Sequence, residues 1–294
     1  MSQYDINLAV QQYTTNVQLL VQQKGSRLRN AVMVGQHYGK QAVAVDQYAA
    51  VNASKRTGRY QPLVPYDVQN DRRWVSPVDY DWTDLVDNFD KLRLLNDPMS
   101  SYVQSGANAL LRAMDDEIIA SFFGTAKTGE TGSSSTVFLT GNQVSVSFGA
   151  AAASGLSVAK LIEARRLLMS HEVDIDADPL FCVISAKQHA NLLNEIQVVN
   201  TDYNSSAVLV NGKVDSFLGI NFIHSERLPT NTSTYRRVPV FAKSGMHLGI
   251  WNDIMTDISQ RKDLSSLPWQ VLCQGTFGAT RLEEKKIIEL PCAE

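Results

Sequence analysis

The chain has 294 residues, 44% of them hydrophobic, and a formal net charge of −3. This length and apolar content allow a sizeable core and more than one lobe. No run approaches the roughly 20 apolar residues that cross a bilayer, and residues 1–23 lack the pattern of a secretory signal. Three widely spaced cysteines, Cys182, Cys273 and Cys292, argue against a disulfide framework and a Cys-x-x-Cys metal site, so we expect reduced, cytoplasmic folding.

Residues 1–34 are polar with scattered apolar positions, which indicates an N-terminal arm. From Ala31 to Val51 apolar residues recur with period two, which predicts strands. Residues 54–59 read SKRTGR, a polar, basic turn. We therefore predict a two-stranded finger over residues 35–78, with about 15 residues per limb and a reach of roughly 50 Å. Such a ribbon is marginal on its own in water and needs a surface to lie on. Its return limb contains three prolines, which suit an edge or extended strand: Pro62, Pro65 and Pro77.

Charge is distributed unevenly along this part of the chain. Between Lys24 and Tyr60 there are seven basic residues against one acid, and between Asp67 and Asp97 there are eight aspartates. Aromatic residues interleave with the basic ones, as in a binder of single-stranded nucleic acid. The chain as a whole is slightly acidic, however, whereas nucleic-acid-binding domains are usually basic. The pattern is better matched to two surfaces that meet on neighbouring copies of the same chain.

A long helix is predicted over residues 98–124. Asp97 can cap its start, Pro98 suits its first position, and Gly124 is a natural stop. About 27 residues give a rod of about 40 Å, long enough to span a domain. Apolar residues recur along the segment at helical spacing: Tyr102, Val103, Ala107, Leu110, Leu111, Met114, Ile118 and Phe122.

The remaining chain interleaves helices and strands without a regular βαβ repeat, which predicts an α+β fold. A second helix is expected from Ser157 to near His171, and a third after the capping residue Ser185. Asn211-Gly212 predicts a hairpin turn. Apolar residues alternate at Val137 and Leu139 and, further on, at Val144, Val146 and Phe148. Strands are predicted at 181–184, 208–210, 220–224, 238–242, 247–251, 270–274 and 286–290.

Several motifs imitate ligand sites without completing them. The segment from Gly124 to Thr131 has the outline of a phosphate-binding loop, but Glu130 stands where the lysine is needed. Asp174-x-Asp176-x-Asp178 imitates the start of a calcium loop, yet the positions for Gly and Glu hold Pro and Ser. These two segments are therefore interpreted as a flexible loop and a solvated acidic turn.

The remaining polar clusters also lack the spacing of a reactive site. Asp115, Asp116 and Glu117 fan over about 200° of a helix, so they cannot converge on one metal, and Arg112 suggests ordinary surface pairing with the two aspartates. The five histidines show no metal-ligand spacing, and no nucleophile elbow is present. We assign no catalytic, cofactor-binding or metal-binding residue, and we expect a protein that is not an enzyme and has no cofactor.

The order of these parts resembles the major capsid proteins of tailed bacteriophages, which share the Hong Kong 97-type shell fold. The most specific block runs from Tyr80 to Gly132 and includes the Tyr-x-Trp-x-Asp-Leu-Val-Asp run, Asp97-Pro98 and Met114-Asp-Asp-Glu-Ile-Ile. The Arg72-Arg73-Trp74 return of the finger precedes it. Further on, Phe181-Cys-Val-Ile-Ser-Ala-Lys-Gln resembles the strand-to-helix entry of that family's axial domain. The resemblance covers nearly the whole chain.

The resemblance implies a structural protein that assembles as pentamers and hexamers into an icosahedral shell around double-stranded DNA, without sequence-specific contact. It further implies a portal, a separate scaffolding protein and possibly a decoration protein as partners, assembly in the host cytoplasm and residence in the virion. The implied segments are the arm (1–34), the extended loop (35–78), a peripheral domain (79–173) with spine helix 98–124, an axial domain (174–262) and a return to the peripheral domain (263–294).

A subunit interface is hypothesised from the charges, with basic residues of the loop and its return facing acidic residues of a neighbouring copy. Two alternatives remain open at this point. One is the shell of an encapsulin-type compartment, which encloses cargo enzymes, and the other is a soluble α+β hydrolase with dispersed catalytic residues. The interface candidates are Lys40, Lys55, Arg56, Arg59, Arg72 and Arg73, with Asp84, Asp87 and Asp90.

Overall fold

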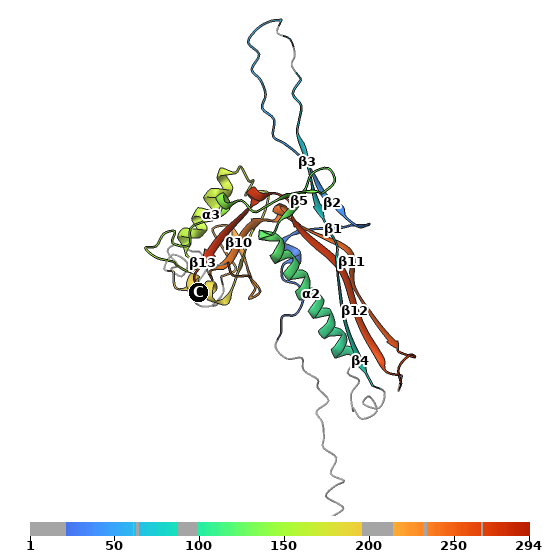
Figure 1. Ribbon diagram of the computed structural model, residues 1–294. Helices are drawn as coiled ribbons and strands as arrows, with labels where there is room; N and C mark the ends of the chain where they lie inside the picture. Colours follow the sequence, from blue (N-terminus) through green and yellow to red (C-terminus); the bar gives the residue numbers. More distant parts are fainter. Residues whose placement is uncertain are drawn as a thin grey trace, which may run out of the picture. The chain divides into compact units, whose positions relative to one another are not determined.

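The computed structural model describes residues 22–60, 62, 65–87, 99–195, 214–231, 234–265 and 267–294 (Figure 1). The chain divides into two compact units, which we describe one at a time. The predicted limits of the arm, the extended loop and the two domains stay predictions. Unit 1 consists of Met1–Ser26, Asp79–Ala113 and Asn252–Thr276, and unit 2 of Arg27–Val78, Met114–Trp251 and Phe277–Glu294.

Helices and strands are mixed along the chain, which confirms the predicted α+β class. The helices are α2 (Met99–Phe123), α3 (Val158–Ser170) and α4 (Ala186–Leu193), with short 3-10 turns at η2 (Arg29–Ala31), η3 (Thr140–Asn142), η4 (Lys243–Gly245) and η5 (Glu284–Lys286). The strands are β1 (Met33–Gln36), β2 (Ala42–Tyr48), β3 (Asn70–Val75), β4 (Val78–Val86), β5 (Ala126–Thr128), β6 (Ser134–Thr136), β7 (Leu180–Ile184), β8 (Ser216–Phe217), β9 (Ile220–His224), β10 (Arg236–Ala242), β11 (Met246–Gln260), β12 (Trp269–Arg281) and β13 (Ile287–Cys292). They form three sheets with the orders β1-β11-β12-β4, β13-β10-β7-β9-β8 and β2-β3-β5-β6.

The long helix is confirmed as α2. It ends where predicted, because the Gly124 N–H donates to the Ala120 carbonyl at 3.0 Å and the chain then enters β5. The predicted start at Asp97 and Pro98 lies outside the described residues. Among the described helices none is long and apolar enough to cross a membrane. Helical spacing places one apolar face of α2 in the core, with Leu110, Met114, Ile118, Ile119 and Phe122 buried.

In unit 1, the first part of α2 packs on β4 and β12. Val86 of β4 and Val271 of β12 are buried in one cluster. The helix approaches the strands closely at Gly106, because an added Cβ there would lie 2.4 Å from Trp82 Cε3 and 2.7 Å from Cys273 Sγ. The partly buried side chains packed against the cluster are Trp82, Tyr102, Val103 and Trp269.

In unit 2, the five-stranded sheet has both parallel and antiparallel pairs. Strand β7 pairs parallel with β9 and antiparallel with β10, which pairs antiparallel with β13. The predicted helix after Ser157 is α3, and it contacts β13. Ser185 begins α4 as predicted, its N–H donating to Gln188 Oε1 at 2.7 Å. The predicted hairpin at Asn211-Gly212 and the strand 208–210 before it lie outside the described residues.

The finger is a hairpin as predicted, but its ladder is much shorter than expected. Strands β2 and β3 pair antiparallel from Ala42↔Val75 to Tyr48↔Asn70, and one further bond joins Ala49 N–H to the Gln69 carbonyl. No described residue from 50 to 69 belongs to a strand. Polar residues in both limbs and prolines in the return limb disfavour a longer ladder, so pairing is confined to the base of the hairpin, where Arg73 and Trp74 of β3 also pair with β5.

Two predicted strands are much longer in the structure. The strands predicted at 247–251 and 270–274 extend to 15 and 13 residues, as β11 and β12. Most residues of β11 after Ile250 are exposed, so they lack the alternation of apolar and polar residues by which strands are recognised. The alternating residues between Val137 and Phe148 form no strand in the structure: β6 ends before them, η3 lies among them, and Gln143 makes an isolated bridge to Glu289.

Candidate assembly surface: the extended loop and its base

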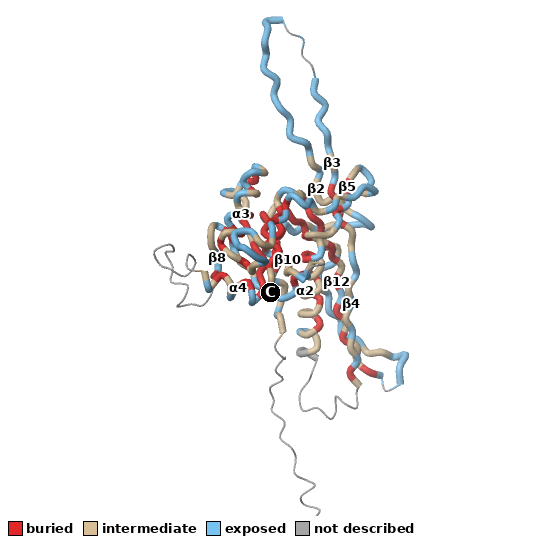
Figure 2. The backbone as a smooth tube through the Cα atoms, turned by 60° about the vertical axis from the view of Figure 1, so that its left-hand side comes forward, coloured by how far each residue is buried: buried red, intermediate tan, exposed pale blue. Residues whose placement is uncertain are grey.

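The segment between β2 and β3 is exposed throughout its described part, residues 49–60, 62 and 65–69. Figure 2 shows both limbs in the colour of exposed residues. Large apolar side chains lie in solvent along them and at the end of β2. The exposed fractions are 74% for Tyr48, 60% for Val51, 97% for Tyr60, 64% for Tyr66 and 42% for Val68.

The basic candidates of the loop lie on this exposed segment. Lys55, Arg56 and Arg59 are exposed, and Lys40 is exposed on the approach to β2. Arg56 folds back on the turn, with Nε donating to the Gly58 carbonyl at 2.9 Å and Nη2 to the Arg59 carbonyl. Within the described residues no carboxylate pairs with these four side chains.

The acidic candidates lie at the end of β4 in unit 1. Asp84 and Asp87 are half-exposed, and Asp84 Oδ1 accepts the Leu85 N–H at 2.8 Å. Asp90 lies outside the described residues.

The two arginines of the return limb are placed differently from each other. The Arg72 side chain is 47% exposed and pairs across the hairpin with Asp46, Nε to Oδ1 at 2.8 Å. Arg73, by contrast, is 6% exposed and donates two bonds of 2.8 Å to the carboxylate of Glu284. Because its guanidinium is already bound inside the subunit, we do not carry Arg73 into the proposed interface.

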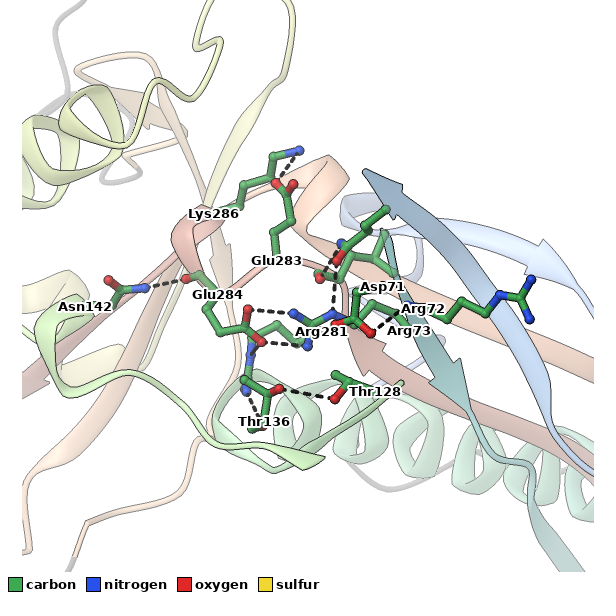
Figure 3. A network of polar contacts seen from close by, with 12 residues as sticks. Asp71, Arg72, Arg73, Thr128, Thr136, Asn142, Arg281, Glu283, Glu284 and Lys286 are labelled. Carbon is green, nitrogen blue, oxygen red and sulfur yellow. Dashed lines mark hydrogen bonds and ion pairs between the residues drawn. The ribbon is translucent and has the colours of Figure 1, made fainter. Parts of the chain in front are cut away.

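Around Arg73 the structure builds a polar network that anchors the base of the hairpin (Figure 3). Arg281 is fully buried and donates to the carbonyls of Phe122 and Gly124 at 2.9 and 2.8 Å, where α2 ends. Its Nη2 reaches the Thr136 carbonyl at 3.2 Å, and its Nε lies 3.5 Å from Glu284 Oε1. Sequence reasoning missed both Arg281 and Glu284, because neither belongs to a motif and only the fold brings them to Arg73.

Asp115 is a second anchor that sequence reasoning misplaced. The expected surface pairing with Arg112 is wrong, since Asp115 is fully buried and its carboxylate accepts the N–H groups of Arg27 and Leu28 at 3.0 and 3.2 Å. Arg112 donates instead to Gln22 and Gln23, within the predicted arm. The later part of the predicted arm is therefore held by the helix.

The motifs that imitate ligand sites have structural roles. The residues from Gly124 to Thr131 form β5 and the turn to β6, where Trp74 Nε1 donates to the Gly129 carbonyl at 2.7 Å. Asp174 Oδ1 accepts the N–H groups of Asp176 and Ala177, both at 3.1 Å, which is a local turn. Among the described residues no group of three or more His, Cys, Asp or Glu is arranged to hold a metal.

Two histidines meet where β1 pairs with β11. His37 Nε2 and His247 Nε2 lie 2.8 Å apart, so one ring donates to the other. Burial lowers the pKa of His247 to about 4, aided by the nearby His37, and burial lowers the pKa of His37 too. Both lowered pKa values favour neutral rings at pH 7, with an N–H of one ring donating to the unprotonated nitrogen of the other. This pair fastens the segment that leads into the hairpin.

The three cysteines are free thiols, as their spacing predicted, and all three are buried. Burial raises the pKa of Cys292 to about 12 and raises the pKa values of Cys182 and Cys273. Neutral, buried thiols are poor nucleophiles and poor metal ligands. Their role in this fold is packing.

Comparison with known proteins gives a consistent answer. The sequence profile of the family described as "Phage capsid protein" matches residues 6–294. No curated protein sequence matches the chain. The fold is similar to the capsid of cyanophage P-SCSP1u, with 17% identity, a TM-score of 0.76 and coverage of 98% of this chain and 94% of that chain.

Other solved capsids are also similar in fold. The capsid of cyanophage Pam1 has 13% identity and a TM-score of 0.74, with coverage of 98% and 97%. The capsid of the native GTA particle has 13% identity and a TM-score of 0.72, with coverage of 98% and 96%. Together with the exposed loop and its buried anchor, these matches place the chain in the phage capsid protein family, as a major capsid protein with the Hong Kong 97-type fold of tailed bacteriophages.

Proposed function

We propose that this capsid protein assembles as pentamers and hexamers into an icosahedral shell that encloses double-stranded DNA, with its loop and arm lying on neighbouring subunits. The observation that carries the proposal is the loop between β2 and β3, whose described residues are exposed, apolar in part and basic at the tip. Burying one such apolar side chain stabilises a contact by about 1.5–3 kcal/mol. A neighbouring copy supplies the surface that the loop lacks in its own subunit.

The distribution of charged residues suggests which surfaces of neighbouring copies face each other. Lys40, Lys55, Arg56 and Arg59 face the region of Asp84, Asp87 and Asp90 on an adjacent copy, with Arg72 at the rim. No single contact need be strong, because several interfaces of about 4 kcal/mol each, millimolar one by one, hold a closed shell when they are engaged together.

The net charge and the capsid family suggest what the shell contains and which partners it needs. A net charge of −3 lets packaged DNA lie against the wall without tight binding, since affinity for DNA grows with the number of phosphates neutralised. We propose that the role is structural and not enzymatic. We also propose a separate scaffolding protein and a portal as partners, with assembly in the host cytoplasm. Membership of a capsid family favours this function over the hydrolase alternative.

The test is assembly of the full chain, expressed alone and with its neighbouring genes, followed by sedimentation and negative-stain imaging. Closed shells or five- and six-membered rings are expected, and a strict monomer or dimer in both cases would contradict the proposal. DNA in the particles distinguishes a virion shell from an encapsulin-type compartment with enzyme cargo.

A loop variant tests the mechanism within that experiment. Replacing residues 51–67 by a short Gly-Ser turn keeps the paired strands β2 and β3 and their anchor. The free energy of unfolding of this variant, measured by urea denaturation, is expected to stay within about 1 kcal/mol of the native value. The variant is expected to form no shells. Shells of normal yield from this variant would show that the loop is dispensable.

A further inference from the structure

Both strands of the hairpin base are attached to one short segment of unit 2, residues 282–284. Arg73 of β3 donates Nη1 to Glu284 Oε1 and Nη2 to Glu284 Oε2, both at 2.8 Å. In β2, Gln47 Nε2 donates to the Leu282 carbonyl at 2.8 Å, and Gln47 Oε1 accepts Arg73 Nε at 3.3 Å. The bidentate geometry fixes direction as well as distance, because a planar fork meets a planar carboxylate in one orientation.

The segment that receives the hairpin is itself held firmly. The Asn142 amide donates to the Glu284 carbonyl, and the buried Arg281 just before the segment binds three carbonyls at 2.8–3.2 Å. These contacts tie it to the end of α2 and to β6 (Figure 3). The hairpin base therefore rests on a rigid support inside its own unit.

We propose that Arg73 is a positioning residue for assembly, whose paired contact with Glu284 fixes the direction in which the loop 49–69 leaves the subunit. This inference rests on the proposed function, in which the loop reaches a neighbouring copy. About ten residues per limb reach roughly 33 Å, so a change of about 10° at the base displaces the tip by roughly 6 Å. That displacement exceeds the length of a hydrogen bond, about 3 Å, so contacts at the tip would be lost.

The Glu284 carboxylate lies beside two guanidinium groups, those of Arg73 and Arg281. Removing Arg73 and removing Glu284 therefore have different consequences. If Arg73 is shortened, the carboxylate keeps Arg281 at 3.5 Å and no buried charge is left alone. If Glu284 is removed, two buried guanidiniums face each other. Burial and the nearby Arg73 lower the pKa of Arg281, whereas Glu284 raises it. The charge of Arg281 is therefore stabilised by Glu284 and opposed by Arg73. Arg73 can thus be changed in a folded subunit, whereas Glu284 cannot.

The experiment compares Arg73→Gln, Arg73→Lys and a matched control, Arg237→Gln. Arg237 makes the same kind of bidentate pair with buried Glu289, at 2.7 and 2.8 Å, between β10 and β13 and outside the hairpin. Three quantities are measured for each full-length variant: the urea midpoint of unfolding, the protein concentration at which half the chain sediments as shells, and the amide hydrogen exchange of β2 and β3.

Arg73→Gln is expected to raise the half-assembly concentration about tenfold or more, the equivalent of one lost contact of 1.4 kcal/mol. Arg73→Lys should give an intermediate value, because it restores the charge and only one of the two bonds. Arg237→Gln should lower the urea midpoint at least as much but change assembly less than about twofold. Faster exchange in β2 and β3 is expected only for the Arg73 variants.

Three outcomes would overturn the inference. The first is an equal loss of assembly for Arg73→Gln and Arg237→Gln, because assembly would then merely follow stability. The second is normal assembly of Arg73→Gln. The third is an unchanged rate of amide hydrogen exchange in β2 and β3 of Arg73→Gln. If the native chain forms no shells, the proposed function fails, and the exchange of β2 and β3 still decides whether Arg73 fixes the hairpin.

Discussion

At the scale of single residues, neighbours in the sequence have opposite environments. Asp115 and Asp116 follow one another on α2, yet Asp115 is fully buried and binds two backbone N–H groups, whereas Asp116 is partly exposed and pairs with Arg227. A buried carboxylate is tolerated only when it is paired or hydrogen-bonded. Asp115 meets this condition through the chain at Arg27 and Leu28, and its contribution to stability is therefore expected to be large.

Asp115→Ala is expected to lower the free energy of unfolding by about 2–4 kcal/mol, because the part-buried N–H of Arg27 and the buried N–H of Leu28 lose their acceptor. Asp116→Ala is the control and should cost no more than about 1 kcal/mol, the value of an exposed ion pair. Urea denaturation of both variants measures the difference. Equal losses at the two positions would show that Asp115 has no special role.

At the scale of elements, the helix α2 was predictable and its closest contact was not. A capping residue, a period of 3.6 and a glycine stop are local signals, so residues 98–124 were recognisable as a helix. Gly106 lies in the interior of this helix, where glycine costs about 1 kcal/mol relative to alanine. The structure shows its purpose in unit 1, where the backbone lies against Trp82 and Cys273.

Gly106→Ala is therefore expected to destabilise the protein by about 1–3 kcal/mol through overpacking, despite the better helix propensity of alanine. The matched control is Gln104→Ala on the exposed side of the same helix, which should be neutral or slightly stabilising. Thermal and urea unfolding measure the stability of both variants relative to the native chain. A stabilising Gly106→Ala would mean that Trp82 moves aside at little cost.

The extended loop shows the opposite case, an element whose existence was predictable and whose pairing was not. The alternation of β2 and the prolines after it indicated two limbs. Pairing along their whole length would need a packed face, and the described residues beyond Ala49 have none. Under the proposed function the loop completes its contacts on a neighbouring copy, which one chain's sequence does not define.

At the scale of the whole molecule, charge complementarity between copies can be tested by a charge swap. Arg56→Glu with Arg59→Glu is expected to raise the half-assembly concentration at least about tenfold at low salt, an effect that shrinks near 1 M salt because exposed charges are screened. Adding Asp84→Lys and Asp87→Lys to the same chain should restore much of the assembly. Sedimentation at two salt concentrations measures each variant.

The control for the swap changes the net charge by the same amount outside the loop, with Lys187→Glu and Lys285→Glu at exposed positions of unit 2. This control should assemble normally. If it fails like the loop variant, general repulsion explains the loss. If the fourfold variant stays as poor as the reversal alone, the proposed pairing of Arg56 and Arg59 with Asp84 and Asp87 is incorrect.

By itself, the sequence determined the α+β class, the long helix, the order of parts that resembles a capsid protein, and the segregation of basic and acidic residues. These depend on periodicity, capping and composition, which are properties of short stretches of chain. Only the tertiary structure decided that Arg73 is bound to Glu284, that Asp115 is buried and that the loop is exposed beyond Ala49. Residues 211 positions apart, such as Arg73 and Glu284, meet only when the chain folds, because burial and pairing depend on what packs from elsewhere.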